Sequence, residues 1–158
     1  MDEKICSFFG HREITEKERL YEIAKREILK AIEHGARSFL FGGFGEFDAL
    51  CHYIVSEICK CSPYLNIKRI FCVPTEKELR KPSRHFNVAD YDDIIYLLPS
   101  FDGWYKSIYF RNCAMIDKSD FIIFYAENRE NSGACKAYKY AIKKKNKTII
   151  NIYDENNK

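Results

Sequence analysis

At 158 residues the chain has the length of one domain, with room for a sizeable core. Its balance of 46% hydrophobic and 31% charged residues excludes a disordered chain, and a net charge of +3 is too small to indicate a nucleic-acid partner, which we therefore do not expect. No apolar stretch approaches the roughly 20 residues that span a bilayer, and the first residues lack the pattern of a signal peptide. We therefore expect a cytoplasmic protein that does not contact a membrane.

The cysteines and histidines predict no metal site. The closest cysteine pair, Cys59 and Cys61, has no second close pair, and the four histidines are scattered. Seven cysteines in a chain without a secretion signal are expected to be reduced thiols, most of them buried.

Apolar runs alternate with helical patterns along the chain. In chain order the sequence predicts a strand at 4–10, a helix at 15–35, a strand at 37–43, a helix at about 47–61, strands at 67–74 and 93–99, a helix at about 105–118, a strand at 120–126, a helix at about 133–145 and a strand at 147–153. The strand runs are rich in β-branched and aromatic residues, which is typical of strands buried on both faces. Alternation of this kind predicts a parallel α/β sheet, and the chain 1–158 reads as one domain.

Local signals mark several boundaries. Thr15 and Glu18 have the spacing of a capping box, and Gly35 stands where a helix end favours a left-handed residue. The run at 93–99 fits an edge strand or the start of a loop. The polar stretch 75–92 has no clear period and is expected to run over the surface.

Three loops carry the candidate binding residues, because ligands of open parallel sheets bind at the carboxyl ends of the strands, near the point where the strand order reverses. Glycines let backbone N–H groups approach an anion, and a helix N-terminus adds unpaired donors and a positive dipole end. Arg12 could bind phosphate or carboxylate through two parallel N–H bonds of its guanidinium group. Glu46 or Asp48 could accept hydrogen bonds from ribose hydroxyls. The three loops supply Gly10, His11 and Arg12, then Gly42, Gly43 and Gly45 within "GGFGEFD" (42–48), then Ser132 and Gly133.

Each candidate also has a structural alternative. The glycine cluster fits a plain strand-to-helix turn equally well; it is neither a dinucleotide fingerprint nor a Walker loop. Ser132 fits a helix N-cap, and His11 fits a local hydrogen-bond donor. Arg111 and Asn112, within the predicted helix at 105–118, fit either a surface pair or a functional pair.

Four blocks taken together resemble the SLOG superfamily: "GHR", "GGFGEFD", "RNCAMIDKSDFIIFY" and "NSGACKAYKYAIKKKNKTIINI". This Rossmann-like group includes the YpsA-like proteins, the DNA-processing protein DprA and the LOG cytokinin-activating enzymes. The resemblance spans about 5–152 and is closest to the small stand-alone YpsA-like members. It implies a three-layer Rossmann-like domain with a mostly parallel sheet, and a nucleotide or nucleotide-derived ligand bound by the three loops together with Arg111 and Asn112.

The chain departs from the enzymes of this group at two positions. LOG enzymes have Gly-Gly-x-Gly-Thr-x-x-Glu, whereas here Glu46 replaces the Thr and Ala49 replaces the Glu; Asp48, one place earlier, points about 100° away on a helix. The related deoxyribosyltransferases carry a Glu where this chain has Lys136. We therefore expect a ligand sensor or binding module without a cofactor.

Two other functions stay open. The first is an enzyme that cleaves an N-glycosidic or phosphoribosyl bond, with Glu46 and Asp48 as catalytic carboxylates, Glu127 as a further carboxylate and His11 as the acid. The second, weaker one is nucleic-acid binding as in DprA, which would need a basic stripe from Lys77, Arg80, Lys81 and Arg84. The aromatic residues of 75–104 suit a base-stacking wall or a homodimer face.

Overall fold

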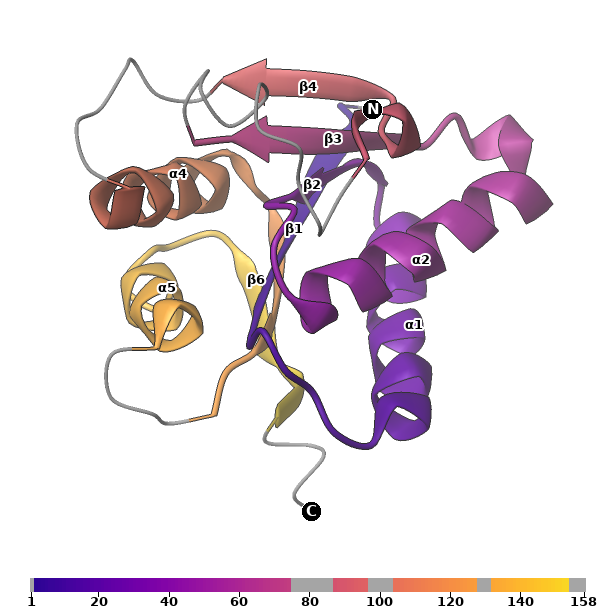
Figure 1. The fold of residues 1–158 in the computed structure, drawn as a ribbon. Coiled ribbons are helices and arrows are strands. Elements are labelled where there is room, and N and C mark those ends of the chain that lie inside the picture. The colour runs from indigo at the N-terminus through magenta and orange to yellow at the C-terminus, as the bar shows by residue number, and fades with distance from the viewer. Residues whose placement is uncertain (1, 75–86, 97–103, 128–131, 154–158) are drawn as a thin grey trace.

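The computed structural model describes residues 2–74, 87–96, 104–127 and 132–153 (Figure 1). One sheet with the strand order β4-β3-β2-β1-β5-β6 runs through the molecule, and every pairing in it is parallel. Its strands are β1 (Lys4–Gly10), β2 (Ala36–Phe41), β3 (Lys68–Val73), β4 (Asp93–Tyr96), β5 (Phe121–Tyr125) and β6 (Thr148–Asn151). The predicted α/β fold with a parallel sheet is confirmed.

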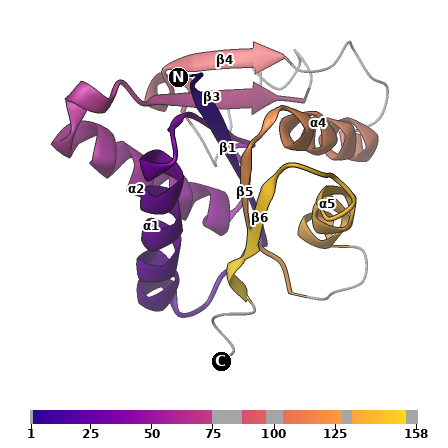
Figure 2. The ribbon, with the colours of Figure 1, turned by 180° about the vertical axis from the view of Figure 1, so that it is seen from behind.

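Helices cover both faces of the sheet and complete three layers (Figures 1 and 2). On one face lie α1 (Lys17–Glu33) and α2 (Glu46–Cys61), and on the other lie α4 (Trp104–Lys118) and α5 (Gly133–Ala141). Two short 3₁₀ helices, η1 (Pro63–Leu65) and η2 (Val88–Asp90), lie in the connections. No described helix is both long and apolar enough to cross a membrane.

The strands are apolar on both sides because each side faces a core. Phe8 of β1 packs in the cluster under α1 and α2, while its neighbour Phe9 packs in the cluster under α4 and α5. In β2, Phe39 likewise packs in the cluster under α1 and α2, and Leu40 packs in the cluster under α4 and α5. Successive side chains of a strand point to opposite faces, so a strand covered on both faces needs apolar residues throughout.

Several predicted boundaries change in the structure. The capping box of Thr15 and Glu18 is wrong: the N-cap of α1 is Glu16, in a left-handed conformation (φ 51°) and without a side-chain cap. The left-handed residue predicted after this helix is confirmed, because Gly35 has φ 106° and its N–H bonds the carbonyl of Ile32. The run beginning at 93 is an edge strand over Asp93–Tyr96; 97–99 and 75–86 lie outside the described residues.

Five of the seven cysteines are buried, as expected, and all seven are free thiols; Cys59 is half-buried and Cys61 is exposed. Among the described residues, no group of three or more His, Cys, Asp or Glu side chains could hold a metal ion.

The chain order sets the position of the site. From β1 the chain builds outward through β2 and β3 to β4, and it then returns to place β5 on the other side of β1. The strand order therefore reverses between β1 and β5, whose carboxyl ends meet at Gly10 and Tyr125. In open α/β sheets the ligand crevice lies at this switch point.

Candidate ligand site at the carboxyl ends of the strands

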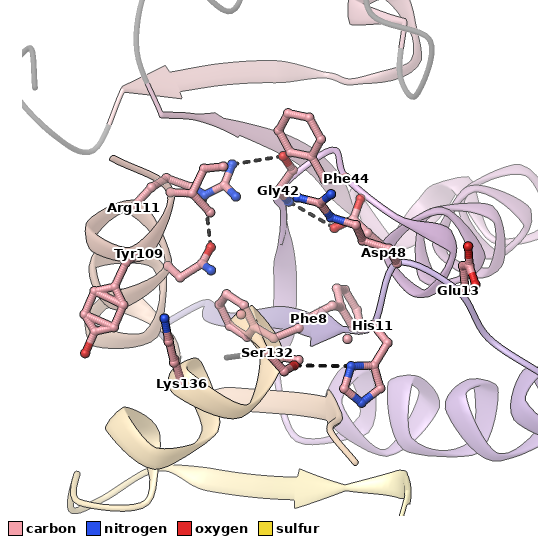
Figure 3. A pocket seen from close by; sticks show the side chains of 17 residues that line it. Phe8, His11, Glu13, Gly42, Phe44, Asp48, Tyr109, Arg111, Ser132 and Lys136 are labelled. Carbon is pink, nitrogen blue, oxygen red and sulfur yellow. Dashed lines mark hydrogen bonds between the residues drawn. The ribbon is translucent and has the colours of Figure 1, made fainter. Parts of the chain in front are cut away.

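A cavity of about 520 Å³ opens at the switch point, between the loop after β1, the glycine loop after β2, and the helices α4 and α5 (Figure 3). It brings together most of the residues that the sequence analysis assigned to a ligand. Those that line it are Gly10, His11, Arg12, Gly42, Asp48, Arg111, Asn112, Ser132 and Gly133. The other three, Gly43, Gly45 and Glu46, do not line it.

The first backbone N–H groups of the glycine loop are already bonded within the chain. Asp48, on the first turn of α2, accepts from Gly42 N–H through Oδ1 (3.0 Å) and from Gly43 N–H through Oδ2 (3.1 Å). From the other side, Arg111 of α4 donates through one guanidinium nitrogen to the carbonyls of Gly42 (2.9 Å) and Cys72 (3.0 Å). Both charged side chains are buried. They stabilise the loop, and the two N–H groups that the sequence suggested for an anion are occupied by a carboxylate of the chain itself.

Packing explains why this turn needs glycines. Gly43 and Gly45 have φ values of 80° and 88°, a region that side chains disfavour. A Cβ on Gly43 would overlap the ring of Phe71, and one on Gly45 would lie 2.9 Å from the Cα of Arg12. The cluster is thus a tightly packed strand-to-helix turn that forms one wall of the cavity.

The two candidate catalytic carboxylates lie in different environments. Burial raises the pKa of Asp48 to about 6, although the N–H groups of Gly42 and Gly43 and the charge of Arg111 act in the opposite direction. Glu46 instead accepts from Ile14 N–H (2.7 Å) and pairs with Lys17 (3.5 Å), and the bond from Ile14 holds its pKa below the usual value. Glu46 therefore ties the loop after β1 to α2.

His11 connects the ends of β1 and β5 to α5. Its Nε2 accepts from Glu127 N–H (2.7 Å), and since a backbone N–H can only donate, the ring proton is assigned to Nδ1. Nδ1 lies 3.4 Å from Oγ of Ser132 (Figure 3). That oxygen also accepts from Cys135 N–H, which confirms the predicted N-cap. A hydroxyl oxygen that accepts two bonds keeps its own hydrogen for a further acceptor.

The rest of the lining adds polar and aromatic groups. Asn112 accepts from Arg111 Nε through Oδ1 (3.1 Å), so its NH₂ group keeps donors for other partners. Arg111 is 3% exposed, so the reading of this pair as a surface feature is wrong. Lys136 lies on the first turn of α5 and Tyr109 on α4, and both line the cavity, as does Phe44 (Figure 3).

Sequence reasoning did not assign Phe44, Tyr109 or Lys136 to the site. A signal was present for Lys136, which lies three residues after Gly133 and thus on the same helix face as the predicted N-terminal site. Phe44 lies inside the quoted glycine motif, and Tyr109 lies two residues before Arg111. Neither residue has a neighbouring sequence signal that would assign its side chain to the site. The basic residues at 77, 80, 81 and 84 lie outside the described residues.

The strand order and the position of the cavity define a Rossmann-like α/β domain with a candidate ligand site at its switch point. Among solved structures, the chain is similar to the DNA-processing protein DprA of Streptococcus pneumoniae, with a TM-score of 0.64, 14% identity, and coverage of 93% of this chain and 49% of that chain. It is also similar to DprA of Helicobacter pylori, with a TM-score of 0.59, 16% identity, and coverage of 93% and 64%. The chain thus spans less than two thirds of either DprA chain.

At these identities the likeness shows the fold, which agrees with the SLOG resemblance because DprA belongs to that superfamily. The finer resemblance to YpsA-like and LOG members stays a prediction, as does a homodimer. No family model and no curated protein matches the sequence.

The comparison corrects one expectation. The Helicobacter pylori structure is described as showing the single-stranded DNA binding mode of that DprA. Our expectation that nucleic acid is not a partner is therefore wrong. It was inferred from the net charge alone. A charge summed over the whole chain does not report the groups that gather at one site, and it is these groups that contact phosphates.

Proposed function

We propose that the cavity at the switch point binds the phosphate and sugar of a nucleotide. The nucleotide is either a free nucleotide-derived molecule or one unit of single-stranded nucleic acid, since both present the same chemistry to the site. The observation that carries the proposal is the convergence of the α5 N-terminus, Ser132, Arg12 and Lys136 on one cavity at the switch point.

The α5 end of the cavity is the side suited to phosphate. The first N–H groups of a helix have no partner within the helix, and its dipole favours an anion there. A Cβ added at Gly133 would meet no atom of the described residues within 4 Å, so these residues leave open space above the helix start. Ser132 adds a hydroxyl, and the exposed side chains of Arg12 and Lys136 add positive charge.

The lining from α4 and the glycine loop is suited to the sugar and base. Phe44 and Tyr109 offer ring surfaces, and the amide of Asn112 offers N–H donors. The volume of about 520 Å³ lies within the range of roughly 300–1,000 Å³ usual for small-molecule sites.

The geometry supports a binding module over an enzyme. Both oxygens of Asp48 accept backbone N–H groups, and Glu46 is bonded to Ile14 and Lys17, away from the cavity. Glu46 does not line the cavity, and Asp48 lines it with both oxygens already bonded to the backbone. This arrangement suits support of the loop better than the role of a nucleophile or general base.

One observation favours the second candidate function, cleavage of an N-glycosidic or phosphoribosyl bond. Asp48 lines the cavity, and burial raises its pKa to about 6, a value suited to proton transfer near neutral pH. Release of free base or ribose phosphate from nucleotides by the purified protein, lost in Asp48→Asn, would establish this function in place of simple binding.

The test of binding uses two probes, a set of nucleoside monophosphates and a fluorescent single-stranded oligodeoxynucleotide. Lys136→Gln is compared with Lys139→Gln, an exposed lysine on the same helix that does not line the cavity. We expect Lys136→Gln to weaken binding at least about tenfold, because a hydrogen bond to a charged group contributes about 1.5–3 kcal/mol, and Lys139→Gln to change it little.

A free nucleotide and single-stranded nucleic acid are distinguished by which probe binds and by how the affinity depends on salt concentration. A mononucleotide site gives saturable binding of one monophosphate, whereas a nucleic-acid site prefers the oligonucleotide and loses affinity steeply with salt concentration. Equal effects of the two lysine substitutions, or binding of neither probe, would contradict the proposal.

A further inference from the structure

The outer side of β6 is a free edge of the sheet, since no other described strand pairs with it. On its inner side, the N–H of Thr148 donates to the carbonyl of Asp120, directly before β5 (2.9 Å). The main-chain groups of successive strand residues point to alternate sides, so the N–H and carbonyl groups of Ile149 and Asn151 point away from β5. β6 therefore presents backbone donors and acceptors to a further strand.

The side chains along this edge are largely apolar and partly exposed. Ile149 packs against the cluster under α4 and α5, and Ile150 packs against the cluster under α1 and α2, yet neither is fully buried. Ile150 and the exposed Thr148 also line an open groove beside the second half of α1. Charged residues or a proline often protect an edge strand from pairing, and Thr148–Asn151 contains neither. The edge is therefore suited to pairing with another chain.

The charges on the two sides of β6 in the sequence are opposite in sign. Four of the five residues at 143–147 are lysines, and Asp154 and Glu155 follow the strand, in the part of the sequence after the described residues. In an antiparallel pair, the residues before one strand meet the residues after the other. Two copies of β6 paired in this way would bring opposite charges together, whereas a parallel pair would bring like charges together.

We propose that two copies of the chain associate through antiparallel pairing of their β6 strands about a two-fold axis. Ile149 of one copy exchanges both main-chain bonds with Asn151 of the partner subunit, and the reverse pair does the same. The two Ile150 residues lie opposite each other at the axis. This register uses every outward N–H and carbonyl group of Ile149 and Asn151, and it joins the two six-stranded sheets into one.

The pairing leaves the candidate ligand cavity of each copy open. No residue of β6 lines that cavity, and antiparallel sheets have their carboxyl ends at opposite edges, so the two cavities face opposite directions. The dimer is therefore independent of the function proposed for the cavity and should form without a nucleotide. A peptide of another protein is the competing occupant of the edge, but the opposite charges before and after β6 favour a second copy.

The first test measures the mass of the natural protein by analytical ultracentrifugation between about 1 μM and 1 mM chain. Pairing over one short strand gives a small interface, so we expect a weak dimer and a mass that rises from one chain to two across this range. Hydrogen exchange at the two ends of the range locates the interface. The amides of Ile149 and Asn151 should exchange at least about tenfold more slowly in the dimer, and those of the other edge strand, β4, should not change.

A pair of variants at Ile149 separates the backbone bond from the side chain. Ile149→Pro removes the outward N–H and keeps the bonds of β6 to β5, which come from the residues on either side, so an edge strand tolerates it. It should weaken the dimer at least about tenfold, because one bond of each Ile149–Asn151 pair is lost. Ile149→Ala removes most of the side chain and keeps the N–H, so it should weaken the dimer less.

Three results would overturn the proposal: a mass of one chain throughout the range, a dimer whose Ile149 and Asn151 amides stay unprotected, or equal weakening by the proline and alanine variants. The second result would place the contact between copies on another surface. If Ile149→Pro fails to fold, hydrogen exchange of the natural protein still decides.

Discussion

Asp48 and Arg111 hold the backbone of Gly42 from two sides: the carboxylate accepts its N–H (3.0 Å) and the guanidinium donates to its carbonyl (2.9 Å). One side chain comes from α2 and the other from α4, on opposite faces of the sheet. The end of β2 is thus bonded to helices of both outer layers, and this link shapes the wall of the cavity at the switch point.

Asp48→Ala should destabilise the protein by about 2 kcal/mol or more at pH 7. The substitution leaves the N–H groups of Gly42 and Gly43 without the acceptor they have in the natural protein and removes the negative charge of Asp48 from beside Arg111. Each orphaned buried donor costs about 1–3 kcal/mol. Urea unfolding measures the loss. Glu46→Ala, which removes a half-buried carboxylate on the same turn, is the control and should cost less; equal losses would contradict the role of Asp48.

The stability advantage of the natural protein over Asp48→Ala should decrease as the pH rises. The folded-state pKa of Asp48 is about 6, above the usual 3.8, so between these values the folded state binds more protons than the unfolded state and stability falls with pH. A shift of this size amounts to about 3 kcal/mol between about pH 4 and pH 7. Urea unfolding of both proteins across this range measures the difference, and a constant difference would show that Asp48 titrates at its ordinary pKa.

Ser132→Asp should separate the cap of α5 from ligand binding. Aspartate is a good N-cap, so the stability should change by less than about 1 kcal/mol. A negative charge at the site proposed for phosphate should, however, weaken nucleotide binding more than tenfold. Thermal unfolding and a binding titration on the same sample measure both.

Ser132→Ala is the complementary variant, since it loses the cap bond to Cys135 N–H and should cost about 1 kcal/mol of stability. Retained nucleotide affinity in Ser132→Asp would place the phosphate elsewhere.

Gly45→Ala should destabilise the protein, whereas Gly133→Ala should not. The first change adds a Cβ at φ 88° and 2.9 Å from the Cα of Arg12, so strain and a backbone clash together should cost about 2 kcal/mol. The second adds a Cβ that meets no atom within 4 Å in the part of the chain that the structure describes. Unfolding curves of the two variants provide the comparison, and similar stability would show that the glycine loop can relax.

The sequence predicted the features that local chemistry controls. Apolar runs and helical periodicity placed the strands and helices, with errors of a few residues at their ends, and Ser132 was recognised as an N-cap from its neighbours alone. The boundary errors have a physical cause: Gly42 and Gly43 extend the apolar run of β2, yet the backbone turns there because Asp48 binds both N–H groups.

The candidate site was predicted only in outline. That three loops meet at one edge of the sheet follows from the rule for parallel strands, and the cavity lies at these loops. The rule for parallel strands did not, however, predict the role of each residue in the site. Glu46 and Asp48 are two positions apart and chemically alike, yet one faces Ile14 and Lys17 and the other is buried beside Arg111.

By itself, then, the sequence determined the class of fold and the edge of the sheet at which the candidate site lies, because hydrophobic period and turn residues act over a few positions. Only the tertiary structure decided which groups are available there. The bond between Arg111 and Gly42 joins residues 69 positions apart, and the burial that raises the pKa of Asp48 comes from packing between layers. Contacts of this kind leave no local pattern, since they depend on where the fold brings distant segments together.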